Sequence, residues 1–266
     1  MNSNAARNVI ENLSWDEVSR RIAEGAAAIL PIGAAAKQHG FHLPMKTDRV
    51  QAEWLAAEIA GRVDALIWPT VAYGYYPAFV EYAGSASLSA PVFESLVREI
   101  AAGIVGFGCR ALFVLDTGIS TIAPVDRAIA GLNNPNVLHL KIYDGPRYRR
   151  ATERLVEQGH GSHADELETS LMLAMAPHLV DMVRAEASPV LQRETPGPLT
   201  PSDTASPNYS RSGSFGDPTL ATLAKGDVLL AAMVEDTLAA VESFLTCQAT
   251  QTVEPNATPR RRRVAP

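Results

Sequence analysis

Short apolar runs alternate with helical patterns along this chain, and that alternation restricts the fold more than any other feature. Runs typical of buried strands cover residues 27–32, 65–69, 111–115 and 137–143. Helical apolar spacing covers residues 15–28, 48–63, 91–106, 125–132, 166–176 and 219–245. Strands separated by helices predict an α/β fold, a three-layer α/β/α arrangement with helices on both faces of a mostly parallel sheet. In such sheets, ligands bind beyond the carboxyl ends of the strands.

Composition excludes several classes of protein. With 47% apolar and 20% charged residues over 266 positions, the chain is too apolar to be wholly disordered and long enough to bury a core without disulfides. A net charge of −6 argues against a nucleic-acid surface. Cys109 and Cys247 lie far apart and form no zinc-ribbon spacing. Because the sequence has neither a secretory signal nor a membrane-spanning run, we expect a cytoplasmic protein. No membrane partner is expected, and the expected partner is a small-molecule substrate.

The predicted organisation is a single domain over residues 1–247. Within it, residues 188–217 form a long Pro/Ser-rich stretch without helix or strand periodicity. We expect this stretch to be an ordered loop near the functional site, because it ends in a Gly-rich turn just before a strong helical pattern. Residues 248–266 are expected to be a disordered tail, and its basic run at 260–263 to be solvated.

The densest polar cluster, residues 37–48, follows the first predicted strand. It contains His39 and Asp48, and imidazole and carboxylate groups are good ligands for zinc, manganese or iron. The alternative is that both residues are structural and make hydrogen bonds within the loop.

A second polar cluster precedes and enters the helix predicted at 166–176. Acidic residues such as Asp165 and Glu166 suit a first helical turn, because they complement the helix dipole. Helix capping does not account for His163, so this cluster also carries candidate functional groups. Glu168 lies on a different side of the helix from the two capping acids.

Two further segments follow predicted strands. Residues 115–121 contain Asp116, Thr117 and Thr121, and form either a tight capped turn or a cradle that binds a substrate carbonyl. The aromatic stretch after the second strand offers Tyr75 and Tyr76 as candidate walls of a substrate pocket, and core packing is the alternative for both.

These motifs, in this order, resemble those of the creatininase (creatinine amidohydrolase) family from about residue 30 to residue 245. Gln-His-Gly-Phe-His-Leu-Pro-Met-Lys-Thr-Asp at 38–48 resembles the family's first metal motif. His-Ala-Asp-Glu-Leu-Glu-Thr-Ser at 163–170 resembles its second and is the most specific match. Gly-Asp-Pro-Thr-Leu-Ala-Thr at 216–222 resembles its C-terminal motif.

The resemblance implies a metal-dependent hydrolase of cyclic amides and related C–N bonds, with an α/β/α fold and two divalent metals. It implies a homo-oligomer, commonly a hexamer. Residue by residue, it implies that His39 is a metal ligand and that Asp48 is the bridging carboxylate. It further implies Glu168 as a ligand and His163 as a ligand or general acid/base.

The sequence departs from the family pattern at the second metal. A Glu ligand of the family is replaced by Lys37, a His ligand by Ile119, and a further Glu position by Thr121. A protonated lysine repels a divalent cation. We therefore expect one divalent metal (Zn, Mn or Fe), held by His39, Asp48 and Glu168, with Lys37 in place of the second ion.

The predicted activity is hydrolysis of a small cyclic amide, lactam or related amide, and creatinine itself is not the expected substrate. His163 would move protons, and Lys37 with Thr117 and Thr121 would stabilise the oxyanion, beside Asp116 as a substrate contact. Two alternatives stay open at this point. One is a metal-free lyase or isomerase that uses Lys37, and the other is a non-catalytic binding or scaffold homologue.

Overall fold

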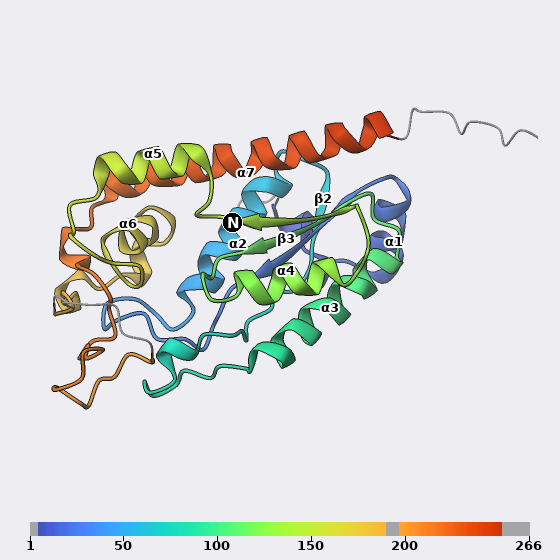
Figure 1. The fold of residues 1–266 in the computed structure, drawn as a ribbon. Helices are drawn as coiled ribbons and strands as arrows, with labels where there is room; N and C mark the ends of the chain where they lie inside the picture. Colours follow the sequence, from blue (N-terminus) through green and yellow to red (C-terminus); the bar gives the residue numbers. More distant parts are fainter. Residues whose placement is uncertain (1–4, 190–196, 252–266) are drawn as a thin grey trace, which may run out of the picture.

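A four-stranded parallel sheet forms the centre of the computed structural model, which describes residues 5–189 and 197–251 (Figure 1). The strands lie in the order β2-β1-β3-β4, and all three neighbouring pairs are parallel. Their bounds are Ala27–Ile32 for β1, Ala65–Ile67 for β2, Leu112–Asp116 for β3 and Val137–Lys141 for β4. The predicted parallel sheet is confirmed.

Helices account for most of the remaining described chain. The α-helices are α1 (Trp15–Ala23), α2 (Thr47–Ala60), α3 (Ala90–Gly106), α4 (Ile122–Ala130), α5 (Pro146–Leu155), α6 (Glu166–Met175) and α7 (Leu223–Gln251). Short 3-10 helices are η1 (Ala5–Asn8), η2 (Ile10–Asn12), η3 (Pro77–Phe79), η4 (Pro177–Leu179), η5 (Met182–Arg184) and η6 (Pro218–Leu220).

The sheet is covered on both faces, which confirms the three-layer α/β/α arrangement. Successive strand residues point to opposite faces, so Leu30 of β1 packs with α3 and α4 while Ile29 packs with α2, α5 and α7. Phe113 of β3 joins the second of these cores and Val114 the first. Because helices cover both faces, β1 and β3 are apolar and buried almost throughout.

Helix boundaries differ from the predicted ones where the backbone turns. The first helix ends at Ala23 rather than residue 28, because Gly25 adopts a φ of 94° and β1 begins two residues later. The predicted capping box of Ser14 and Glu17 is present at its start. Helix α5 lies in a segment that the sequence analysis did not identify as helical. Helix α7 runs to Gln251, so residues 248–251 of the predicted tail are helical.

The long C-terminal helix α7 holds α5 and α6 in place. Its Asp236 accepts hydrogen bonds from the backbone N–H groups of Arg147 (2.8 Å) and Tyr148 (2.9 Å), at the start of α5. At its own start, Gly226 packs so closely against α6 that a Cβ atom would lie 2.0 Å from the carbonyl oxygen of Ser170. One element therefore positions both α5 and α6.

The described part of the Pro/Ser-rich segment, residues 197–217, packs against the 37–48 loop. The amide Nε2 of Gln38 donates to the carbonyl of Gly213 at 2.8 Å. Residues 190–196 and 252–266, which belong to the predicted loop and tail, lie outside the described residues. Over residues 5–189 and 197–251, no helix is long and apolar enough to cross a membrane.

Candidate active site at the carboxyl edge of the sheet

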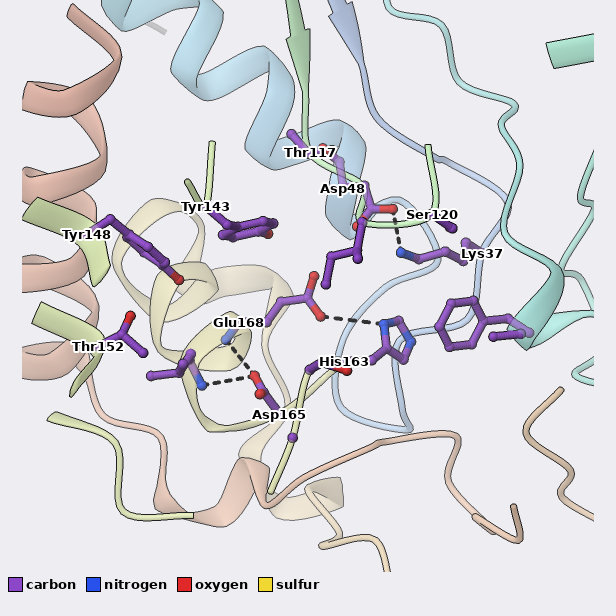
Figure 2. Close-up of a pocket in the computed structure, with 16 residues that line it drawn as sticks. Lys37, Asp48, Thr117, Ser120, Tyr143, Tyr148, Thr152, His163, Asp165 and Glu168 are labelled. Carbon is purple, nitrogen blue, oxygen red and sulfur yellow. Dashed lines mark hydrogen bonds and ion pairs between the residues drawn. The ribbon is translucent and has the colours of Figure 1, made fainter. Parts of the chain in front are cut away.

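A cavity of about 390 Å³ lies beyond the carboxyl ends of the strands, where the fold places ligand sites (Figure 2). Figure 2 shows Lys37 and His163 at one end, Tyr148 and Thr152 at the other, and Glu168 between them. Three polar clusters of the sequence thus converge on one space.

The loop before α2 buries His39 and holds it at both ring nitrogens. Its Nδ1 lies 2.9 Å from the carbonyl oxygen of Lys37, and its Nε2 lies 2.9 Å from Oδ1 of Asp48. Both partners are acceptors, so Nδ1–H donates to the carbonyl, and the second contact needs a proton or a metal cation between Nε2 and Oδ1. Asp48 is fixed by its place in the first turn of α2, whose backbone lies directly against Gly33.

Lys37 forms a buried ion pair with the other oxygen of Asp48. Its Nζ lies 2.7 Å from Oδ2, and the side chains are only 10% and 4% exposed. Burial opposes ionisation of Asp48, but the Lys37 ammonium and His39 outweigh it and hold the pKa of this carboxyl well below its usual range. The ring of Phe79 lies 5.2 Å from Nζ and covers the ammonium.

His163 presents a free lone pair to the cavity. Its Nε2–H donates to the carbonyl oxygen of Gln38 at 2.8 Å, so Nδ1 carries the lone pair and lies 3.8 Å from Glu168 Oε2. Its ring stacks 4.0 Å from that of Phe79 and 4.8 Å from that of His39. Burial lowers the pKa of His163 well below its usual value, and the nearby Lys37 charge adds to the effect, so the imidazole is neutral at pH 7.

Both oxygens of Glu168 are oriented by neighbouring donors. The N–H of Ala164 donates to Oε2 at 2.6 Å, and the Gln51 amide Nε2 donates to Oε1 at 3.3 Å. Ala164 reaches this position with a φ of 46°, a left-handed conformation that is uncommon for a residue with a side chain. Asp165 is the N-cap residue of α6 and accepts hydrogen bonds from the N–H groups of Leu167 and Glu168 at 3.0 Å, as the capping interpretation predicts.

These groups fit a single divalent cation. The ligand atoms of His39, His163 and Glu168 all lie within 4.8 Å of one another, and Asp48 Oδ1 adjoins the first of them. Neutral imidazole and carboxylate are the donor set of zinc, manganese and iron sites. The Nδ1–H contact of His39 with a carbonyl is the outer-shell hydrogen bond typical of a metal-binding histidine.

The predicted hydroxyl groups are engaged elsewhere. Thr121 Oγ1 donates to Asp116 Oδ1 at 2.7 Å, and Thr117 Oγ1 donates to the carbonyl of Ile32 at 3.0 Å. Asp116 also accepts from the N–H of Gly118 and approaches Nε2 of His139 at 3.3 Å. These contacts shape the turn after β3, in which Thr121, the residue before α4, makes no side-chain capping hydrogen bond.

Tyr75 and Tyr76 lie apart from the cavity. Tyr76 is 3% exposed and donates through its hydroxyl to the Ala86 carbonyl at 2.8 Å, while Tyr75 packs on the core beneath α3. Neither side chain lines the 390 Å³ cavity, and Tyr76 borders a smaller space beside Lys37 and Asp48. A role of either tyrosine in substrate binding stays a prediction.

Other residues complete the wall and were not identified from the sequence. They are Phe79, Tyr143, Tyr148 and Thr152. Tyr143 donates to Gln51 Oε1 at 2.8 Å, and thereby supports the amide that orients Glu168. Gln51 lies three residues after Asp48 in α2, and that helical spacing was the one available sequence signal for it.

Comparison with known proteins identifies the family of this chain. The family model described as creatinine amidohydrolase matches residues 11–241. Creatinine amidohydrolase of Pseudomonas putida is 26% identical over 247 residues, covering 85% of this chain and 93% of that protein. The mycofactocin precursor peptide peptidase of Mycobacterium tuberculosis H37Rv is 27% identical over 266 residues, covering 92% and 97%.

Solved structures extend the similarity to three dimensions. A crystal structure of creatininase superimposes with a TM-score of 0.78 at 26% identity, covering 89% of this chain and 97% of that one. A manganese form of creatininase gives a TM-score of 0.77 at 26% identity, with 89% and 98% covered. The family model spans most of the chain, and the chain therefore belongs to the creatininase family of amidohydrolases.

Proposed function

We propose that this protein hydrolyses the C–N bond of a small amide at a centre that holds one divalent metal ion. The observation that carries the proposal is that the two carboxylate oxygens of Asp48 have different partners. Its Oδ2 binds the Lys37 ammonium at 2.7 Å, while its Oδ1 faces His39 Nε2 at 2.9 Å across a contact that a cation would satisfy. The Asp48 carboxylate can thus bind the Lys37 ammonium through one oxygen and one metal ion through the other.

His39, Asp48 and Glu168 are the proposed ligands of that ion, which is zinc, manganese or iron. A bound divalent ion would polarise the amide carbonyl and lower the pKa of a water molecule. Asp48 is preferred to His163 as the third ligand, because a carboxylate supplies negative charge and already adjoins His39.

His163 is the proposed proton carrier. Its side chain lines the cavity in which a substrate would lie, and its Nδ1 lone pair is free to accept a proton. Phe79 covers its ring on one side and so limits the access of water.

Lys37 supplies the positive charge that a second metal would bring. The space beside it, between Asp48, Thr117 and Thr121, has a volume of about 10 Å³, enough for a water-sized group only. In this buried setting, an ammonium stabilises the oxyanion that develops on the substrate carbonyl. Thr117 and Thr121 are left out of this role, because their hydroxyl protons are donated to Ile32 and Asp116.

The substrate is an amide other than creatinine in this proposal. The relatives named above act on creatinine and on a precursor peptide, as their names state, and both substrates contain a C–N bond next to a carbonyl. Because Lys37 and Ile119 stand at two family ligand positions, the centre differs from one that would hold two ions. A homo-oligomeric state and a cytoplasmic location remain predictions.

Metal content tests the proposal first. Protein purified without chelators or a His-tag should contain about one equivalent of zinc, manganese or iron by mass spectrometry. His39→Ala and Asp48→Asn should lose the metal, and His160→Ala, which lies beside Phe215 outside the ligand group, should retain it. Two equivalents, or none after incubation with each ion, would contradict a one-metal centre.

Measurements of substrate turnover distinguish the proposed metal ligands from the proposed proton carrier. We would screen creatinine, lactams, cyclic imides, formamides and open-chain amides with the metal-loaded protein. His163→Gln should keep the metal and lose turnover, as expected of a proton carrier. If His163→Gln loses the metal instead, His163 is a ligand and its assignment as the proton carrier is wrong.

A further inference from the structure

The end of the cavity farthest from Lys37 has its own chemistry. We call it the tyrosine end and define it by Tyr143, Tyr148, Thr152 and Leu167, which line the cavity on the side of α5 and α6. Figure 2 shows the labelled members of this group on the opposite side of Glu168 from Lys37. None of these four side chains is a proposed ligand of the metal.

The walls of the tyrosine end are aromatic and uncharged. The rings of Tyr143 and Tyr148 lie 5.7 Å apart at an angle of 52°. Burial raises the pKa of Tyr148 and that of Tyr143 well above the usual value of a phenol, so both side chains are neutral at pH 7. Such walls favour a flat or branched apolar group.

The hydroxyl group of Thr152 is buried at the same end. Its Oγ1 is shielded from solvent, and its interaction with the Tyr148 hydroxyl opposes the rise in the pKa of that phenol. The Thr152 hydroxyl is therefore not available to a ligand, and binding at this end depends on apolar contact with the aromatic rings.

The charged side chains around the cavity determine which ligand groups the tyrosine end excludes. Among the described residues that line the cavity, Lys37 is the one lysine or arginine, and its Nζ is bound to Asp48. Asp165 and Glu168 lie between Lys37 and the tyrosine end and would repel a carboxylate placed there. A volume of about 390 Å³ belongs to the range of sites for drug-sized ligands, and a small ring alone would leave much of it unfilled.

From these observations we propose that the tyrosine end is a substrate subsite for an uncharged aryl or branched aliphatic group, so that the enzyme acts on an open-chain amide carrying such a group. The reacting carbonyl would lie by Lys37 and Glu168, and the apolar substituent would lie between the two tyrosines. This inference rests on the proposed function for the reaction, and on the cavity alone for the binding preference.

Binding of simple amides to the purified protein tests the subsite apart from turnover. The probes are acetamide, 3-phenylpropionamide and its para-carboxyphenyl analogue, with dissociation constants measured by ligand-observed NMR titration. Burying a phenyl group should tighten binding about tenfold or more over acetamide. The carboxylated analogue should lose that gain.

Variants on α5 test whether the phenyl group binds at the tyrosine end. Thr152→Phe should fill the tyrosine end and remove the advantage of 3-phenylpropionamide, whereas Glu153→Phe, on the exposed side of the same helix, should preserve it. Leu167→Trp fills the same space from α6 and serves if Thr152→Phe does not fold.

The outcomes distinguish the subsite from the reaction. Equal affinities for acetamide and 3-phenylpropionamide, or an advantage that survives both filling variants, would overturn the subsite even if small lactams are hydrolysed. A phenyl preference that both variants remove would establish the subsite, and a lack of amide turnover would then count against the proposed function alone.

Discussion

Lys37 Nζ lies 2.7 Å from Asp48 Oδ2, where the ammonium neutralises a carboxylate that is 4% exposed. Truncating one partner of a buried ion pair leaves the other charge uncompensated. The pair is therefore part of the stability of the protein as well as part of its proposed chemistry, and the two contributions can be measured separately.

Lys37→Met should reduce kcat at least about 100-fold, because one stabilising charge at the oxyanion is lost. The variant should stay folded, with a free energy of unfolding lower by about 3 kcal/mol. Urea unfolding and steady-state kinetics would measure the two effects. Lys46→Met, a matched change at the residue before α2, should affect neither. Full activity in Lys37→Met would show that the ammonium has no catalytic role.

Acid should destabilise the protein partly through His42. This side chain is 2% exposed, and burial lowers its pKa from 6.5 to about 4. Between these values the unfolded chain binds more protons than the folded one, so stability falls as pH falls through this window, by up to about 3 kcal/mol.

His42→Gln should make the loss of stability between pH 7 and pH 4.5 smaller, though not zero, because the pKa of His163 is shifted in the same direction. Urea unfolding at both pH values would measure it. His178→Gln, at an exposed position, should leave the wild-type pH dependence intact. An identical pH dependence in His42→Gln and wild type would contradict the assignment.

Asp236→Ala should destabilise the protein by about 1–3 kcal/mol, because the N–H groups of Arg147 and Tyr148 lose their common acceptor at the start of α5. The neighbouring Glu235 forms a more exposed ion pair with Arg147 at 3.2 Å, so Glu235→Ala should cost less than about 0.5 kcal/mol. Thermal unfolding would compare the two. Equal effects would mean that Asp236 does not cap α5.

Two glycines should respond to alanine in opposite directions. Gly226→Ala should cost about 1–3 kcal/mol, because a Cβ there would overlap the backbone of Ser170. Gly103 lies within α3 with no atom near its hypothetical Cβ, so Gly103→Ala should stabilise the protein by about 0.5–1 kcal/mol. Chemical unfolding of both variants would measure the sign of each change in the free energy of unfolding. A neutral Gly226→Ala would contradict the close packing of α7 on α6.

The sheet could be predicted because its central strands are short, apolar and buried on both faces. Helix α5 could not, because Pro146 to Arg150 reads as a charged surface segment. Its start is stabilised by Asp236, some ninety residues later in the chain, and by burial of Tyr148 and Ala151. No local pattern contains those contacts.

The candidate site could likewise be predicted only where a local sequence motif carries it. His39, Asp48, His163 and Glu168 lie in distinctive motifs, and the structure brings these four together. The residues that line the substrate cavity could not be predicted in this way. The position of Tyr75 and Tyr76 after a strand predicts them as pocket walls, whereas Tyr143 and Tyr148, just before and within α5, line the cavity. The pairing of Thr121 with Asp116 depends on how one turn closes, which residue types alone do not specify.

The dependence of α5 and α6 on α7 also sets an order of events during synthesis. Residues 146–175 leave the ribosome well before residues 223–251, at a rate of about 5–20 residues per second. For those seconds, the start of α5 lacks its acceptor and α6 lacks its partner helix, so the nascent cavity has no fixed wall. Ligand binding can begin only when the last helix docks, and a ribosome-stalled chain that ends before α7 should bind neither metal nor amide.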